Sequence, residues 1–199
     1  PWMQGFGLIQ DRDGEEGHTS HESSGWGVLF GLDRRLGENL LLSAALGGSR
    51  HIVRVENSGK ARLTSSDLGL QAAFVRGPLR VQGVASYGYN WHESYRNLAF
   101  GNFARTAEAD FHSQRIGTRL HGGWDFDLRG LRLAPVASLD WAGLARESFE
   151  ETGAGSANLA IDDQFDSIVT ARAGLELDTA WHKRGYWTDL LEVTDGVWW

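Results

Sequence analysis

The sequence that decides the fold reads R-V-Q-G-V-A-S-Y-G-Y-N-W-H over residues 80–92 and F-H-S-Q-R-I-G-T-R-L-H-G-G-W-D-F-D-L over residues 111–128. In both stretches apolar and polar side chains alternate with a period of two, which places them on opposite faces of an extended strand. Each stretch is long enough, at about ten residues or more, for a tilted strand to cross a bilayer. The pattern predicts a sheet with one face toward lipid and the other toward water.

This alternation sorts the side chains into two predicted sets of site residues. We expect the polar set to line a hydrated pore: Arg80, Gln82, Arg115, Arg119, His121, Asp125, Asp127, Arg132, Asp140, Arg172 and Glu176. We expect the apolar set to face lipid: Val81, Tyr87, Tyr89, Ile116, Leu120, Trp124, Phe126, Leu133, Leu139, Trp141, Leu175 and Leu177. Both assignments require each strand to keep one parity toward lipid along its length.

The same period recurs elsewhere in the chain, at residues 26–32, 40–46, 68–74, 131–141 and 169–177. Residues 2–10 are a weaker candidate strand, because Gly5 and Gly7 dilute the apolar face. No segment shows the 3.6-residue apolar period of a helix. The sequence therefore predicts about eight strands in an all-β fold, an antiparallel up-and-down transmembrane β-barrel.

The connections between the predicted strands are of two kinds. The short ones contain Gly, Pro, Asn or Asp, which supply the backbone angles of tight hairpins, and lie at residues 32–39, 76–79 and 129–130. The others are predicted as long polar loops, at residues 11–24, 49–66, 91–110 and 146–166. Short turns on one side and long loops on the other are typical of outer-membrane barrels, whose long loops face outside.

The composition agrees with a barrel without requiring one. Hydrophobic residues make up 41% of the chain and the mean hydropathy is −0.34, but a barrel shows only half of each strand to lipid. No run approaches the ~20 apolar residues that a helical span needs. Aromatic residues toward strand ends suit a membrane interface: Trp26, Tyr89, Trp91, Trp124 and Trp141. The alternative that these aromatics fill a soluble β core remains open.

Charge and residue types exclude some functions. The net charge of −7, without a basic stripe, disfavours nucleic-acid binding. The chain has no cysteine, which suits a protein that crosses an oxidising periplasm. Pro1 opens directly into strand-like sequence without a signal peptide, so we expect a mature domain or a fragment.

Histidines suggest two sites that we weigh against simpler explanations. One candidate metal site comprises His18 and His21 with Glu15, Glu16 and Glu22. A loop rich in Glu, Ser and Gly is more often solvated, so we expect no metal there. His92 and His112 lie toward the predicted rim, where a surface protease needs a His–Asp pair, but nothing in the sequence pairs either with an Asp.

Several phrases, in their order and spacing, resemble one known family. They read W-M-Q-G-F-G at residues 2–7, G-W-G-V at 25–28, G-L-D-R-R-L-G at 31–37, L-R-L-A-P-V-A at 131–137 and F-E-E-T-G-A at 149–154. Each phrase alone is weak, since such turns and strand starts occur in many sheets. Together they resemble the translocator β-domain of autotransporters, the type V secretion proteins of Gram-negative bacteria, over roughly residues 2–182.

The resemblance implies a barrel of the bacterial outer membrane that lets an N-terminal passenger reach the cell surface. The implied partners are outer-membrane lipid, a covalently attached passenger domain and the outer-membrane assembly machinery. Nucleic acid is not among them. The alternative is a ligand-binding or adhesive β domain that acts through its long loops. The sequence leaves the identity of the passenger open.

The sequence departs from the family pattern in two places. The family barrel has about twelve strands, of which about eight are visible here, and the linker helix before the first strand is absent. We therefore expect a partial barrel over residues 1–184. Residues 185–199 form an atypical tail, because Asp195 interrupts the apolar face of the last predicted strand, which ends in Trp199.

Acidic side chains inside the predicted barrel are candidate catalytic groups. Some autotransporters cut their own linker with acidic residues inside the barrel, which makes Asp125 and Asp140 the first candidates here. The simpler interpretation is that these carboxylates pair with arginines on neighbouring strands. The chain has no G-x-S-x-G motif, no phosphate-binding Gly loop and no Cys nucleophile. We expect no enzyme activity of this domain and no cofactor.

Overall fold

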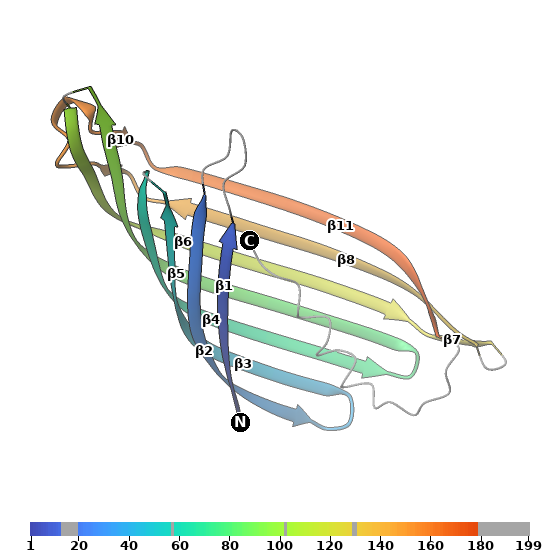
Figure 1. Ribbon diagram of the computed structural model, residues 1–199. Helices are drawn as coiled ribbons and strands as arrows, with labels where there is room; N and C mark the ends of the chain where they lie inside the picture. The colour runs from blue at the N-terminus through green and yellow to red at the C-terminus, as the bar shows by residue number, and fades with distance from the viewer. Residues whose placement is uncertain (13–19, 57, 102, 129–130, 179–199) are drawn as a thin grey trace.

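The computed structural model describes residues 1–178 apart from 13–19, 57, 102 and 129–130. Within these residues one nine-stranded sheet dominates, with the strand order β1-β2-β3-β4-β5-β6-β8-β11 and β7 beside β8 (Figure 1). The strands of this sheet are β1 (Trp2–Arg12), β2 (His21–Leu36), β3 (Leu40–Val55), β4 (Gly59–Arg76), β5 (Leu79–Phe100), β6 (Phe103–Trp124), β7 (Phe126–Leu128), β8 (Leu131–Arg146) and β11 (Gln164–Asp178). A small hairpin contains β9 (Phe149–Glu150), the 3₁₀ helix η1 (Gly155–Ala157) and β10 (Ala160–Ile161).

The predicted up-and-down topology is confirmed. Every strand of the large sheet pairs antiparallel with its neighbours in the sheet, and from β1 to β6 these are also its neighbours in the chain. Strand β7 continues β6 along β8 without a change of register, because Gly123 pairs with Val136 of β8 and Phe126 pairs with Leu133 of β8. Within the described residues β1 and β11 are the two edges, so the sheet is an open, partial barrel.

The long-loop prediction is wrong for two of the connections. Residues 49–66 are mostly paired strand, because β3 continues to Val55 and β4 begins at Gly59. Residues 91–110 are likewise the paired ends of β5 and β6, which meet between Phe100 and Phe103. Polar side chains on both faces do not end a strand, because its backbone hydrogen bonds form whatever the polarity of the side chains.

The other two predicted loops differ from each other. Residues 146–166 contain the β9–η1–β10 excursion, which lies beside the extended tip formed by β5 and β6 (Figure 1). Within residues 11–24, β1 continues to Arg12 and β2 begins at His21, and residues 13–19 lie outside the described residues. The predicted tail at 185–199 also lies outside the described residues.

Two of the predicted tight turns lie at the opposite ends of the strands, although β5 and β6 also meet in a short turn at Gly101, whose φ is 56°. Gly37 and Gly77 have positive φ angles of 69° and 57°, a backbone conformation that glycine adopts without steric cost. These turns join β2 to β3 and β4 to β5. The sheet therefore has a tight-turn end and an end with overhanging strands.

The burial of side chains is the reverse of that in a soluble sandwich. Among the described residues the buried apolar side chains are Leu41 and five alanines. Leu120 is 56% exposed and Trp26 is 62% exposed, whereas Arg80 is 8% exposed. A soluble β core would bury the large apolar groups and expose the arginines. In the same part of the chain, no helix has the length and apolarity to span a membrane.

Strand β1 departs from the pattern of its neighbours. By register, Trp2 lies opposite Gly31 and Phe6 lies opposite Gly27, on the face that carries arginines elsewhere. A Cβ at Gly27 would lie 2.2 Å from the Phe6 ring, so the glycine provides the space that the ring occupies. Trp2, Phe6 and Leu8 thus face the polar side of the sheet. Met3 and Ile9 remain on the apolar face together with Gly5 and Gly7, which explains why that face of β1 is weak in the sequence.

Candidate functional site

The register of the sheet gathers each predicted set of residues on one face. The eleven predicted pore-lining residues share the face that we call the polar face, from Arg80 and Gln82 on β5 to Arg172 and Glu176 on β11. The twelve predicted lipid-facing residues share the opposite face, which we call the apolar face. Many of them, including Leu139 at 51% and Leu175 at 69%, are well exposed.

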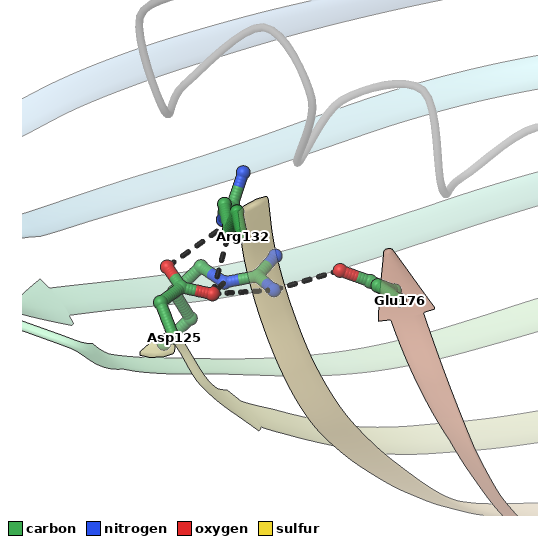
Figure 2. A network of polar contacts seen from close by, with 4 residues as sticks. Asp125, Arg132 and Glu176 are labelled. Carbon is green, nitrogen blue, oxygen red and sulfur yellow. Dashed lines mark hydrogen bonds and ion pairs between the residues drawn. The ribbon is translucent and has the colours of Figure 1, made fainter. Parts of the chain in front are cut away.

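A four-residue charge network crosses the polar face near the tight-turn end (Figure 2). The Asp125 carboxylate accepts hydrogen bonds from Arg80 Nε at 3.1 Å and from Arg132 Nη2 at 3.0 and 3.1 Å. Arg80 Nη2 also donates to Glu176 Oε2 at 2.8 Å. The Arg80 and Asp125 side chains are 10% and 9% exposed, so this pair is largely removed from solvent.

Small residues make this network possible. Strands β6 and β8 lie between β5 and β11, so Arg80 and Glu176 must reach across the sheet to meet. Gly123 of β6 lies opposite Arg80, and a Cβ there would lie 3.3 Å from Arg80 Nη2. Ala134 lies opposite Glu176 and likewise leaves room. The contact across two intervening strands shows that the polar face is the concave face.

A second network centres on Asp140, which is 8% exposed. Its carboxylate is bound by Arg119 from β6 and by Arg172 from β11. Arg115 Nη2 lies 2.9 Å from Asp67 Oδ1, an acidic partner on β4 that the sequence analysis did not identify. Each of the five arginines in the predicted pore-lining set is thus paired with an acid on a neighbouring strand or one close by, which cross-strand geometry favours.

Some predicted residues join neither network. Gln82 is only 2% exposed, and its Oε1 atom has no hydrogen-bond partner among the described residues. Within the same residues, His121 and Asp127 form no ion pair closer than 4 Å.

The residues considered for catalysis are occupied by other contacts. Asp125 and Asp140 each bind two guanidinium groups, as the simpler interpretation predicted. His92 Nε2 lies 2.8 Å from Ser113 Oγ, and His112 Nδ1 lies 3.3 Å from Glu147. The Ser113 hydroxyl is inaccessible, because that residue is 3% exposed.

The candidate metal site falls mostly outside the described residues. His18, Glu15 and Glu16 belong to residues 13–19, whereas His21 and Glu22 begin β2. In the described part of the chain, no group of three or more His, Cys, Asp and Glu could hold a metal ion.

The structure also brings together residues that sequence reasoning missed, at the overhanging end of the sheet. Arg96 of β5 binds Glu151 through both carboxylate oxygens, with Arg96 Nε at 3.0 Å from Oε1. Arg96 Nη2 also donates to the Ala157 carbonyl at 3.0 Å, and the Leu159 N–H donates to Glu151 at 2.9 Å. We call this group the loop latch, because it fastens residues 147–163 to the β5–β6 tip.

Aromatic stacking supports the loop latch. The Phe149 ring stacks on Phe111 with centroids 4.2 Å apart, and Phe111 stacks on His92 at 4.5 Å. Two backbone hydrogen bonds of 2.9 Å join Glu108 to Thr152. The F-E-E-T-G-A phrase quoted above contains both Phe149 and Glu151, so its polar–aromatic composition was the signal available in the sequence.

The latch is expected to open in acid. The hydrogen bond from Arg96 is the largest influence that holds the pKa of Glu151 below its ordinary value of 4.5. A lowered pKa in the folded state stabilises the latch above about pH 4.5, and this stability is lost as the pH falls through the lowered value. The protection factors of the amides in residues 147–163, each taken relative to the intrinsic exchange rate at the same pH, should therefore fall in acid. A Glu151→Gln variant should exchange fast at neutral pH, whereas Glu150→Gln, the matched control, should behave as the native chain.

A family comparison decides what this fold is. The family model described as "Autotransporter beta-domain" matches residues 1–198. The chain belongs to the autotransporter β-domain family. The fold has known counterparts: the translocator domain of the autotransporter NalP from Neisseria meningitidis superposes with a TM-score of 0.66 at 21% identity, over 91% of this chain and 61% of that one. The β-domain of the Bordetella autotransporter BrkA gives 0.55 at 19% identity, over 88% of this chain and 68% of that one.

Curated relatives carry this autotransporter domain within much longer proteins. An "Extracellular serine protease" of Serratia marcescens is 25% identical over 180 residues, which are 90% of this chain and 17% of the relative. "Outer membrane protein B" of Rickettsia typhi is 26% identical over 186 residues, 86% of this chain and 11% of the relative. The chain thus spans less than a fifth of these relatives. It is an autotransporter translocator domain of the bacterial outer membrane, as the sequence predicted.

Proposed function

We propose that the polar face lines a hydrated pore and that the apolar face contacts outer-membrane lipid. The burial pattern supports this assignment, since leucines and aromatics are exposed on one face and arginines form ion pairs on the other. Paired charges next to pore water lose little hydration free energy, whereas unpaired charges that face acyl chains lose much of it. This reversal of burial is the observation that carries the proposal.

The domain's role follows from the pore. A passenger attached covalently at the N-terminal side would pass through the pore or remain anchored at the cell surface. The relatives support this division of labour, because similar β-domains form a small part of proteins with different names. We propose that this domain catalyses no reaction itself, that it needs no cofactor, and that any enzymatic activity belongs to the passenger.

Two further partners belong to the same proposal. A barrel whose strands alternate in this way reaches the outer membrane with the help of the outer-membrane assembly machinery, and then contacts lipid around its circumference. A ligand-binding or adhesive domain acting through long loops is less well supported, because two of the predicted loops are paired strands.

The export role is tested with the full-length protein carrying an epitope at the N-terminal end of its passenger. We expect protease added to intact cells to remove the epitope, because the passenger is exported. Replacing the domain with an outer-membrane barrel that does not translocate should protect the epitope in the periplasm. An epitope that stays protected although the native domain is inserted in the outer membrane would contradict the proposal.

A further inference from the structure

Four cations gather on the apolar face of the sheet, just beyond its apolar band. They are Arg50 and Arg54 of β3 and Lys60 and Arg62 of β4, and we call them the rim cluster. The register pairs Arg54 with Lys60, and it pairs Ile52, the residue between the two arginines on that face, with Arg62. The cluster lies at the overhanging end of the strands, in a stretch that sequence analysis had interpreted as loop.

The rim cluster begins where the apolar band ends. Leu46 and Leu68 pair with each other within the band and are 62% and 40% exposed. Arg50 follows Leu46 by four residues and pairs with Trp26 of β2, while Thr64 pairs with Trp91 of β5. Tryptophans of this kind favour the level of the membrane interface. The cations therefore lie at the height of lipid headgroups.

The rim cluster is only partly neutralised by its own chain. Arg54 lies 3.4 Å from Glu22, and Arg62 lies 2.9 Å from Glu93. Among the described residues, no carboxylate lies within 4 Å of Arg50 or Lys60. Loss of solvation, followed by repulsion from Arg62, lowers the pKa of Lys60. This local excess of cations contrasts with the chain's net charge of −7.

We propose that the rim cluster binds the phosphate groups of phosphorylated glycolipids in the outer leaflet of the outer membrane. A guanidinium group binds phosphate oxygens in a bidentate manner, and an ammonium group adds a point charge. Basic side chains next to an apolar surface attract anionic headgroups in the same way. The acidic neighbours Glu22 and Glu93 flank the cluster, so the phosphate would bind between them, on Arg50 and Lys60. This inference rests on the membrane orientation of the proposed function.

The tight-turn end of the same face provides a matched control. Arg34 of β2 and Arg76 of β4 share the apolar face with the rim cluster and are exposed, but they lie at the opposite ends of their strands. The double variants Arg50→Gln with Lys60→Gln and Arg34→Gln with Arg76→Gln remove the same charge. Only the first pair removes cations from the outer leaflet.

The test uses the full chain in nanodiscs of phosphatidylcholine mixed with a phosphorylated glycolipid, and counts the glycolipid retained per protein after extraction. We expect the native chain and the Arg34/Arg76 variant to retain it, and the Arg50/Lys60 variant to bind it roughly tenfold more weakly. Dephosphorylated glycolipid should not be retained by any of the three. Inorganic phosphate in solution should not displace the lipid at equal concentration, because the acyl chains hold the headgroup at the surface.

Several results would overturn the inference. Equal retention by the native chain and the Arg50/Lys60 variant, or equal loss in both variants, would show that the rim cluster has no special role. Binding of free phosphate with the same affinity would identify an anion site that is independent of lipid. If the native chain inserts into nanodiscs without preferring phosphorylated lipid, this inference fails while the export role stands. If it does not insert, both fail.

Discussion

Substitution of Leu120 by Arg is expected to destabilise the membrane-inserted domain by about 2–4 kcal/mol. Leu120 is 56% exposed on the apolar face and pairs with Leu139 of β8, so both side chains lie within the predicted lipid contact. A guanidinium at this depth must lose its hydration or distort the bilayer. The free energy of unfolding by urea from phospholipid vesicles measures the effect.

The matched control places the same charge on the other face. Ser86 of β5 lies on the polar face opposite Gly117, which leaves room for a longer side chain. Arginine at Ser86 should change the free energy of unfolding by less than about 1 kcal/mol, because pore water can solvate it. Equal costs at Leu120 and Ser86 would remove the distinction between the two faces on which the account depends.

Loss of the Asp125 carboxylate should have an effect of similar size for a different reason. Asp125→Ala leaves Arg80 and Arg132 beside each other without their shared acid, and the Arg80 side chain is only 10% exposed. Removing one partner of a buried ion pair costs about 3 kcal/mol or more. Among the described residues Arg80 then keeps only Glu176 as an acidic partner, and that more exposed carboxylate compensates less. Urea unfolding from vesicles checks this, with Glu176→Gln as the comparison. Glu176 is 49% exposed, so its loss should cost less than about 1 kcal/mol.

A compensating variant distinguishes stranded charge from lost packing. In the double variant Asp125→Ala with Arg80→Met, one of the two guanidinium groups that shared the lost acid is also gone, and the methionine retains an apolar stem. We expect this double variant to be more stable than Asp125→Ala alone. If it is less stable by the sum of the two single effects, Asp125 does not act by neutralising Arg80.

The sequence predicted the fold and the two faces because both depend on a local quantity, the parity of each residue along its strand. The alternation over residues 80–92 was enough to separate Arg80 from Val81 without knowledge of any neighbour. The pairing of consecutive strands was also predictable, since short turns such as Gly77-Pro78 allow only an adjacent antiparallel partner.

The partners within the polar face could not be predicted in the same way. The contact of Arg80 with Glu176 joins residues separated by 96 positions and depends on the curvature of the sheet and on the missing side chain of Gly123. The aromatic residues of β1 lie on the polar face, where Phe6 packs over Gly27 of β2, a complementarity that only the register reveals.

The strand ends were misjudged because polarity was taken to mean loop. Arg50, Arg54 and Arg62 keep the period of two that marks a strand, but an apolar face was expected there. Hydrogen bonds between backbones do not require apolar side chains, so β3 and β4 continue past the apolar band. The loop latch and the rim cluster both lie in such extensions. These extensions are predictable if the two-residue period is sought among polar residues as well as apolar ones.

The solvent at each face can be measured directly, because the chain has no cysteine of its own. Single cysteines would replace Ser86 or Ser138 on the polar face and Leu120 or Leu139 on the apolar face of the inserted domain. We expect a charged, water-soluble thiol reagent to label the two polar-face positions and to leave the two apolar-face positions unlabelled, while a lipid-soluble reagent gives the reverse. If the charged reagent labels Leu120→Cys and Leu139→Cys as fast as the serine positions, the apolar face meets water and the barrel account is wrong.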